Sequence, residues 1–148
     1  MKPNHSIGDV LSTTFRVEEH DLAAFHGEPV HEVCSTFALG REAEWACRQF
    51  VLAMREEHEE GIGCGLRVDH LAPAFAGQQV VVEATLVGLE GSLLTCTWEA
   101  KVDERVIAKG MCEQRLWPRT RIAAHWNQFR PGTDPALVPP PPEHEGLS

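Results

Sequence analysis

A regular spacing of apolar residues between Leu39 and Met54 predicts the longest helix of this chain. The apolar positions recur with the period of an amphipathic helix that buries one face. They are Leu39, Ala43, Ala46, Cys47, Phe50, Val51 and Met54. Glutamates crowd residues 56–60, where the helix dipole disfavours them, so we expect the helix to fray there and to end at Gly61.

Short runs with strand character lie on both sides of this helix. A first strand is expected over residues 11–19, and four more over residues 62–71, 79–89, 93–102 and 105–117. Apolar and polar residues alternate in the segments 79–89 and 93–102, which is typical of strands with one covered face. Well-marked turns separate the last four segments, so consecutive antiparallel hairpins are the simplest connection. The pattern predicts an α+β fold in which a sheet wraps around a single helix.

Two stretches lack a clear period. Residues 20–33 are interrupted by Gly27 and Pro29, and we predict an irregular segment with one helical turn near Leu22–Phe25. Residues 119–129 could add a helical turn or two, whereas the segment after residue 130 is proline-rich and is expected to be disordered. We therefore predict a folded domain over residues 1–118 and a C-terminal extension over residues 119–148.

Composition and charge narrow the classes of function. The chain has 148 residues, 43% hydrophobic and 24% charged, which is a globular composition without an apolar run long enough to cross a bilayer. Its net charge of -9 argues against nucleic acid as a partner, because such partners require a basic surface. The N-terminus lacks the apolar core of a secretion signal, so we expect the protein in the cytoplasm.

The distribution of cysteine and histidine argues against a metal centre. The five cysteines stand singly, without a CxxC pair, which fits reduced thiols used as small core residues. The histidines are not clustered at ligand spacing, so no metal is expected, and no nucleotide-binding or nucleophile-elbow motif is present. Cys34 remains a weak alternative nucleophile, because no histidine lies near it in the helix that follows.

Three polar residues occupy positions that favour chemistry. Thr36 precedes the helix, Glu44 lies at the border of its apolar stripe, and His70 is in phase with Leu66 and Val68 on a strand expected to face the helix. Each also has an ordinary structural explanation, as a helix cap, a residue favoured by the helix dipole, or a core histidine. Together they could activate a hydroxyl or a water beside the free N–H groups of a helix start, which suits chemistry on an ester or thioester.

The chain resembles the hotdog-fold thioesterases and, among them, the fluoroacetyl-CoA thioesterase group. The resemblance is carried by Thr36, by the EWAC motif from Glu44 to Cys47, and by Gly63 ahead of LRVDHLAPA with His70. The segments VVVEATLVGLEG and GMCEQR extend it, so that it covers about residues 8–117. This resemblance implies a curved antiparallel sheet wrapped around one long central helix.

The resemblance also implies an activity and an assembly. It implies a homodimer or a dimer of dimers, with active sites at the subunit interface, that hydrolyses an acyl-CoA substrate without a cofactor. Thr36 would orient or attack the thioester, Glu44 would be its carboxylate partner, and His70 would be the general base. These roles are expectations that the structure must accommodate.

The resemblance further implies which residues contact the substrate. Gly63 would allow a close backbone approach to the acyl group. From the residues themselves, Cys64 and Arg115 are further substrate-binding candidates, because Arg115 forms with Arg119 and Arg121 a cluster that could bind the phosphates of a ligand. The group has an arginine directly after the glutamate of the last strand, whereas here Glu113 is followed by Gln114 and only then by Arg115. Alternation places Arg115 on the opposite face of the strand, so no selectivity for a fluorinated acyl group is predicted.

Two other functions stay open at this point. A hotdog fold could bind an acyl-CoA or another small ligand without consuming it, since a fold does not dictate an activity. A hydratase or dehydratase is a third possibility, although the chain lacks the paired aspartate and histidine motif associated with those hotdog enzymes.

Overall fold

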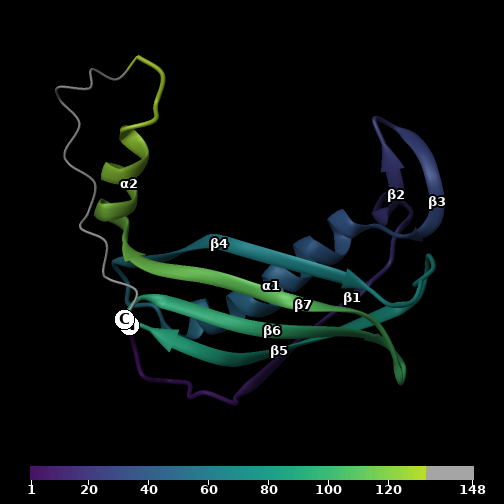
Figure 1. Cartoon of the computed structure of the whole chain (residues 1–148), viewed down its shortest axis with the longest axis horizontal. Coiled ribbons are helices and arrows are strands. Elements are labelled where there is room, and N and C mark those ends of the chain that lie inside the picture. Colours follow the sequence, from purple (N-terminus) through teal and green to yellow (C-terminus); the bar gives the residue numbers. More distant parts are fainter. Residues whose placement is uncertain (133–148) are drawn as a thin grey trace.

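One long helix lies across a curved antiparallel sheet of five strands (Figure 1). The computed structural model describes residues 1–132 of the chain. The helix is α1 (Thr36–Met54), and the α+β architecture agrees with the prediction. In sheet order the strands are β1 (Val10–Arg16), β5 (Gln79–Glu90), β6 (Leu93–Val102), β7 (Arg105–Pro118) and β4 (Glu59–His70).

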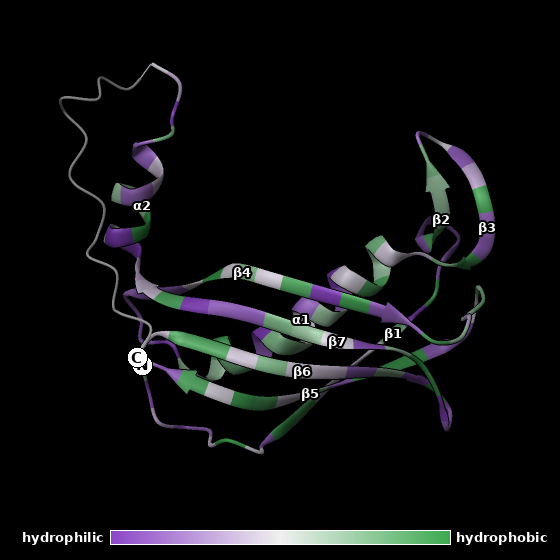
Figure 2. Ribbon diagram, viewed as in Figure 1, coloured by the Kyte–Doolittle hydropathy of each residue, from purple (hydrophilic) through white to green (hydrophobic). Residues whose placement is uncertain are grey.

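The predicted apolar face of α1 forms the centre of the core. Every residue of the predicted stripe from Leu39 to Met54 is buried, and it packs against the inward-facing residues of β5, β6 and β7. Figure 2 shows hydrophobic residues recurring between hydrophilic ones along these strands. Burial of this continuous apolar surface is the main force that holds the helix against the sheet.

The predicted end of the helix at Gly61 is wrong. The helix ends at Met54, and β4 has already begun at Glu59. The Glu60 carboxylate bonds Arg48 at 2.9 Å and also bonds Arg55. The arginines provide partners for the Glu60 carboxylate, and pairing with β7 provides partners for the backbone of this acidic segment. Because the segment is a strand, the helix dipole no longer disfavours its negative charges.

The strand order corrects the expectation that all four later strands form consecutive hairpins. β5, β6 and β7 do pair in sequence order, as predicted. β4 instead pairs with β7, with His70 opposite Ala108, and it therefore forms one edge of the sheet. β1 pairs with β5 and forms the other edge.

The segment predicted to be irregular is a hairpin that projects beyond the sheet (Figure 1). It consists of a short 3-10 helix (Glu19–Asp21), β2 (Leu22–Phe25) and β3 (Glu28–Cys34). The turn residues His26 and Gly27 have φ values of 50° and 80°, as a tight two-residue hairpin turn requires. Most residues of the hairpin are exposed, so its sequence carries no alternation that could have indicated the strands.

The C-terminal extension begins as a helix, as predicted. α2 (Arg119–Asn127) rises from the end of β7 at the other end of the molecule from the hairpin (Figure 1). The predicted disorder after residue 130 falls almost wholly on residues 133–148, which lie outside the described residues. No helix within residues 1–132 is long and apolar enough to span a membrane.

Candidate active site

The start of α1 and the end of β4 bring Thr36 and His70 together. The Thr36 Oγ1 atom lies 2.7 Å from His70 Nε2, and both residues are exposed. Ser35, and not Thr36, is the N-cap, because its side chain accepts a hydrogen bond from the Ala38 N–H at 3.1 Å. The Thr36 hydroxyl is therefore available to the imidazole. A hydroxyl bonded to an imidazole at a surface-accessible helix start can be deprotonated or can orient a water.

The same helix start provides hydrogen-bond donors. The Ala38 N–H is used by the Ser35 side chain, and the Leu39 N–H donates to the Ser35 carbonyl at 3.1 Å. Helix geometry leaves the preceding N–H groups, those of Thr36 and Phe37, without an intrahelical acceptor. They lie beside the Thr36 hydroxyl, where they could hold a carbonyl oxygen as it gains negative charge.

The projecting hairpin places an aromatic residue next to this pair. Phe25 contacts Phe37 edge to face, with ring centroids 5.8 Å apart, although both side chains are largely exposed. Phe37 follows Thr36 directly in α1. The contact that forms this aromatic wall could not be predicted, because the hairpin that carries Phe25 was not predicted. The dipeptide His26-Gly27, which adopts the hairpin turn, is the local feature that could have indicated it.

An ion pair between a buried carboxylate and a half-exposed arginine fixes the base of the hairpin to α1. The Asp21 carboxylate is 2% exposed and lies 2.9 Å from the Arg41 guanidinium. Burial alone would raise the pKa of Asp21, but the Glu18 N–H and Arg41 hold that pKa below its usual value. The Asp21 carbonyl also accepts a hydrogen bond from the Ser35 N–H at 2.8 Å. The hairpin and the helix start are therefore held as one unit.

Glu44 does not join Thr36 and His70 within one chain. Glu44 is eight residues beyond Thr36 on α1, which separates their backbones by about 12 Å along the helix. Its carboxylate lies instead beside Gly63 of β4, where an added Cβ would be 3.2 Å from Oε1. Gly63 is seven residues from His70, or about 23 Å along an extended strand. The absence of a side chain at Gly63 therefore makes room for Glu44.

Gln114 and Arg115 point to opposite faces of β7, as the alternation of side chains along a strand predicted. Gln114 is 4% exposed, and its Nε2 donates to the Glu44 carbonyl at 3.4 Å, so it lies on the helix side near Glu44. Arg115 bonds Ser92 Oγ at 3.3 Å and lies opposite Ile62, far along β4 from His70. The structure therefore does not bring Arg115 to the Thr36–His70 pair. Sequence reasoning noted Gln114 but did not predict its contact with the Glu44 backbone.

The two cysteines singled out in the sequence, Cys34 and Cys64, differ in exposure, and Cys64 is six residues from His70, about 20 Å along β4. Cys34 is buried, and burial raises the pKa of its thiol to about 11, with the nearby Asp21 charge adding to the rise. A thiolate is the reactive form of cysteine, so this environment argues against Cys34 as the nucleophile. Cys64 is exposed on β4, next to Gly63, and its thiol lies 3.4 Å from the Ile62 carbonyl.

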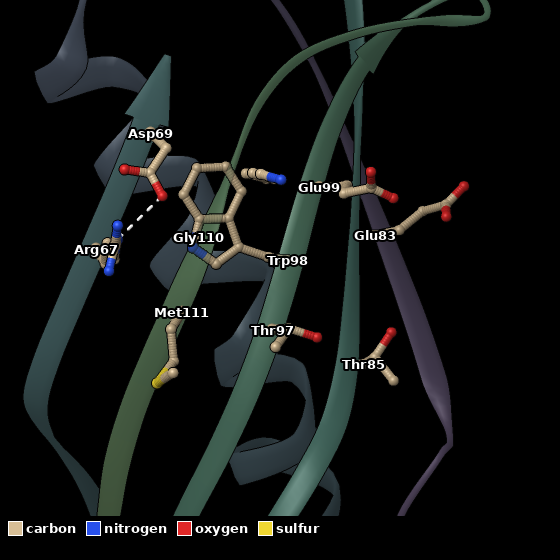
Figure 3. A pocket seen from close by; sticks show the side chains of 10 residues that line it. Arg67, Asp69, Glu83, Thr85, Thr97, Trp98, Glu99, Gly110 and Met111 are labelled. Carbon is tan, nitrogen blue, oxygen red and sulfur yellow. Dashed lines mark hydrogen bonds and ion pairs between the residues drawn. The ribbon is translucent and has the colours of Figure 1, made fainter. Parts of the chain in front are cut away.

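A separate hollow lies on the face of the sheet that points away from α1 (Figure 3). It has a volume of about 390 Å³ and is lined by charges of both signs, including the Arg67–Asp69 ion pair at 3.0 Å. It contains none of the predicted catalytic residues. Within residues 1–132, His, Cys, Asp and Glu side chains do not gather in groups of three that could hold a metal ion.

Solved structures share this arrangement of helix and sheet. A thioesterase superfamily member from Thermus thermophilus is 30% identical, with a TM-score of 0.82 over 87% of this chain and 95% of that chain. A hot-dog-like protein from Thermanaerovibrio acidaminovorans is 20% identical, with a TM-score of 0.77 over 87% of this chain and 94% of that chain. The fold is therefore the hotdog fold, as the resemblance implied.

A third similar structure contains ligands. It is a point mutant of the fluoroacetyl-CoA-specific thioesterase FlK in complex with fluoroacetate and CoA. It is 24% identical, with a TM-score of 0.73 over 80% of this chain and 99% of that chain. Comparison with curated proteins gave no match. A sequence profile of the family described as FlK, fluoroacetyl-CoA-specific thioesterase, matches residues 17–120, and the chain therefore belongs to this thioesterase family.

Proposed function

We propose that the protein hydrolyses an acyl-CoA thioester to the free acid and CoA. The observation that carries this proposal is the 2.7 Å hydrogen bond between Thr36 Oγ1 and His70 Nε2 at the exposed start of α1. His70 accepts a proton from the Thr36 hydroxyl, or from a water that it orients, and the oxygen attacks the thioester carbonyl. The helix-start N–H groups stabilise the oxyanion, and CoA leaves as its thiol with the proton that His70 took up. When water is the attacking group, this step gives the free acid directly. When Thr36 attacks, a water activated by His70 then hydrolyses the threonine ester and releases the acid.

Membership of the family supports a CoA thioester as the substrate class. The fluoroacetyl-CoA-specific thioesterase FlK binds CoA and fluoroacetate in one of the similar structures. Gln114 in place of an arginine after Glu113 distinguishes this chain from the pattern of that group. Its buried amide bonds the Glu44 backbone, so this position carries no positive charge toward the substrate. We therefore propose an acyl group other than fluoroacetyl.

We further propose that the enzyme is a homodimer formed along the β4 edge. An edge strand of this length presents unpaired backbone groups that favour pairing with another strand. The side of α1 next to this edge exposes Phe37, Trp45 and Leu52, and β4 exposes Leu66. Large apolar side chains gathered on one surface are typical of a subunit interface. A two-fold axis would pair β4 with its own copy, because such an interface is self-complementary.

This dimer would bring Glu44 toward the Thr36–His70 pair of the other copy. The exposed run of residues 63–67 has Gly65 at its centre. Antiparallel pairing about Gly65 would set His70 of the partner subunit opposite Glu60. Glu44 lies beside Gly63, which is three residues from Glu60. Along the strand, Glu44 would then be about 10 Å from His70 of the partner subunit, compared with about 23 Å from His70 of its own chain. Glu44 would then complete the site of the partner, as the carboxylate that supports its imidazole and hydroxyl.

Mixing two inactive variants tests both the chemistry and the shared site. Glu44→Ala and His70→Ala are each expected to lose most of the thiol release from an acyl-CoA substrate. When the two variants are unfolded together and refolded, half of the dimers are mixed, and each mixed dimer keeps one intact site. We expect recovery of about a quarter of the wild-type rate, as statistical mixing of a two-fold dimer dictates.

The controls for this experiment use the same proteins. Each variant refolded alone should stay inactive, and light scattering should report dimers in every sample. If mixed dimers form but thiol release does not recover, Glu44 does not act across the interface. If the wild-type protein binds acyl-CoA in calorimetry but releases no thiol, the non-catalytic binding function is correct instead.

A further inference from the structure

Two elements project from the β4 side of the sheet, one at each end. The β2–β3 hairpin rises beside the end of β4 that carries His70, and α2 rises beside the end where β4 begins (Figure 1). Both lie above the same sheet edge, and the exposed stretch of β4 runs between them. Within one chain, α2 therefore stands at the opposite end of β4 from the Thr36–His70 pair.

The base of α2 is attached firmly to the sheet. Arg121 lies over the Trp117 ring at 4.2 Å, and His125 contacts both Trp117 and Phe129 edge to face, at 5.6 and 5.5 Å. The Arg119 guanidinium lies 3.3 Å from the Glu60 carboxylate of β4. These contacts hold α2 upright beside Glu60, so the helix presents its remaining surface in a defined direction.

The remaining surface of α2 and the surface of the hairpin both expose large apolar side chains among polar ones. Trp126 of α2 is 50% exposed, and Phe129 just beyond it is 73% exposed. On the hairpin, Phe25 and Val30 are 58% and 49% exposed. Aromatic side chains left this open on two projecting elements are unusual for a surface that stays in water, and they are enriched at protein interfaces.

The two elements also carry complementary charge. The segment from Trp117 to Arg130 contains three arginines and no acidic residue. The hairpin from Leu22 to Cys34 contains Glu28 and Glu32 and neither lysine nor arginine. Apolar side chains framed by opposite charges provide both contact area and orientation between two surfaces.

We propose that α2 of one copy packs against the β2–β3 hairpin of a second copy and forms a wall of that copy's substrate pocket. The proposal rests on the homodimer along β4. Pairing about Gly65 sets His70 of the partner subunit opposite Glu60, and Glu60 is the residue that α2 contacts through Arg119. α2 therefore stands next to the Thr36–His70 pair of the other copy. Trp126 and Phe129 then meet the Phe25–Phe37 wall and narrow the entrance for the acyl chain.

Cysteine cross-linking tests this placement without any assay of activity. The full chain carries Ala123→Cys on α2 and Val30→Cys on the hairpin, in a Cys64→Ser background that removes the exposed native thiol. A short bismaleimide is expected to give a covalent two-chain product, because the two positions meet only across the dimer. Each single variant should stay a single chain on a denaturing gel.

A matched variant controls for random collision. Val87 is exposed to a similar extent, 42%, but lies on β5, away from the β4 edge. Ala123→Cys combined with Val87→Cys should give no two-chain product. Absence of the product with Val30→Cys, in a protein that light scattering shows to be dimeric, would overturn the proposal, and so would a monomeric protein.

A kinetic measurement separates this inference from the proposed function. Phe129→Ala is expected to raise KM for an acyl-CoA by about three- to tenfold, equivalent to about 1 kcal/mol of lost contact, with the dimer intact. Met111→Ala removes another exposed apolar side chain, 42% exposed against 73% for Phe129, from the outer face of the sheet and should leave KM unchanged. If the chains cross-link but release no thiol, the proposed hydrolysis is wrong, whereas the proposed packing of α2 on the hairpin is supported. An unchanged KM for Phe129→Ala would refute the proposal that α2 forms a wall of the substrate pocket.

Discussion

Replacement of His70 by alanine is expected to lower kcat for acyl-CoA hydrolysis by about 10²- to 10⁴-fold, the usual loss when a general base is removed. The imidazole is the group bonded to the Thr36 hydroxyl, at 2.7 Å. Without it, neither that hydroxyl nor a water beside it has a base within reach. Because the base acts in the chemical step, KM should change much less than kcat. Release of free thiol from the acyl-CoA measures both constants.

His20→Ala provides the matched control. The His20 side chain is 75% exposed at the base of the hairpin, and its Nε2 atom lies 3.5 Å from the Asp21 carboxylate. Asp21 keeps its shorter contact with Arg41 at 2.9 Å in the His20→Ala protein, so this variant should keep the wild-type kcat. Circular dichroism should show that both variants are folded. A His70→Ala protein that is folded and retains the wild-type kcat would exclude His70 as the base.

Gly110→Ala is expected to cause the largest loss of stability among single methyl additions. A Cβ at this position would lie 1.8 Å from the Arg67 carbonyl oxygen and 3.0 Å from the Trp98 ring. The first of these atoms belongs to the backbone of β4, so β4 and β7 would have to separate. We expect the free energy of unfolding to fall by about 3 kcal/mol or more, which is typical of severe overpacking. Urea denaturation measures this change.

A second glycine substitution tests whether the backbone clash is the cause. At Gly88 of β5, an added Cβ would be 3.2 Å from the Thr95 side chain and has no backbone atom in its way. Gly88→Ala should therefore cost much less than Gly110→Ala. Equal losses for the two variants, or a Gly110→Ala protein as stable as the wild type, would contradict the packing of β4 on β7.

The elements with a regular local pattern could be predicted from the sequence. The apolar stripe from Leu39 to Met54 identified α1, because a helix that buries one face must repeat with the helical period. The segment Leu93–Val102 was predicted with the bounds that β6 has. The β2–β3 hairpin was missed because its strands are exposed on both faces, so burial imposes no alternation on their residues.

The partner of a strand is harder to predict than the strand itself. Sequence neighbours suggested that β4 pairs with β5, but β4 pairs with β7, and a different strand, β1, occupies the free side of β5. The position of β4 at the edge of the sheet also determines where His70 lies. His70 alternates in step with Leu66 and Val68, which predicted that its imidazole faces the helix. In the structure the imidazole lies within hydrogen-bond distance of Thr36 at the start of that helix. In the homodimer proposed above, the distance from Glu44 to that pair depends on how the two copies pair, which no local pattern encodes.

Thiol release from a panel of short, branched and aromatic acyl-CoAs by the wild-type protein tests the central proposal most directly. We expect turnover of at least one of these thioesters well above the uncatalysed rate, and loss of that turnover in the His70→Ala protein. No thiol release above background from any member of the panel, by a folded and dimeric protein, would contradict the proposal that this chain is an acyl-CoA thioesterase.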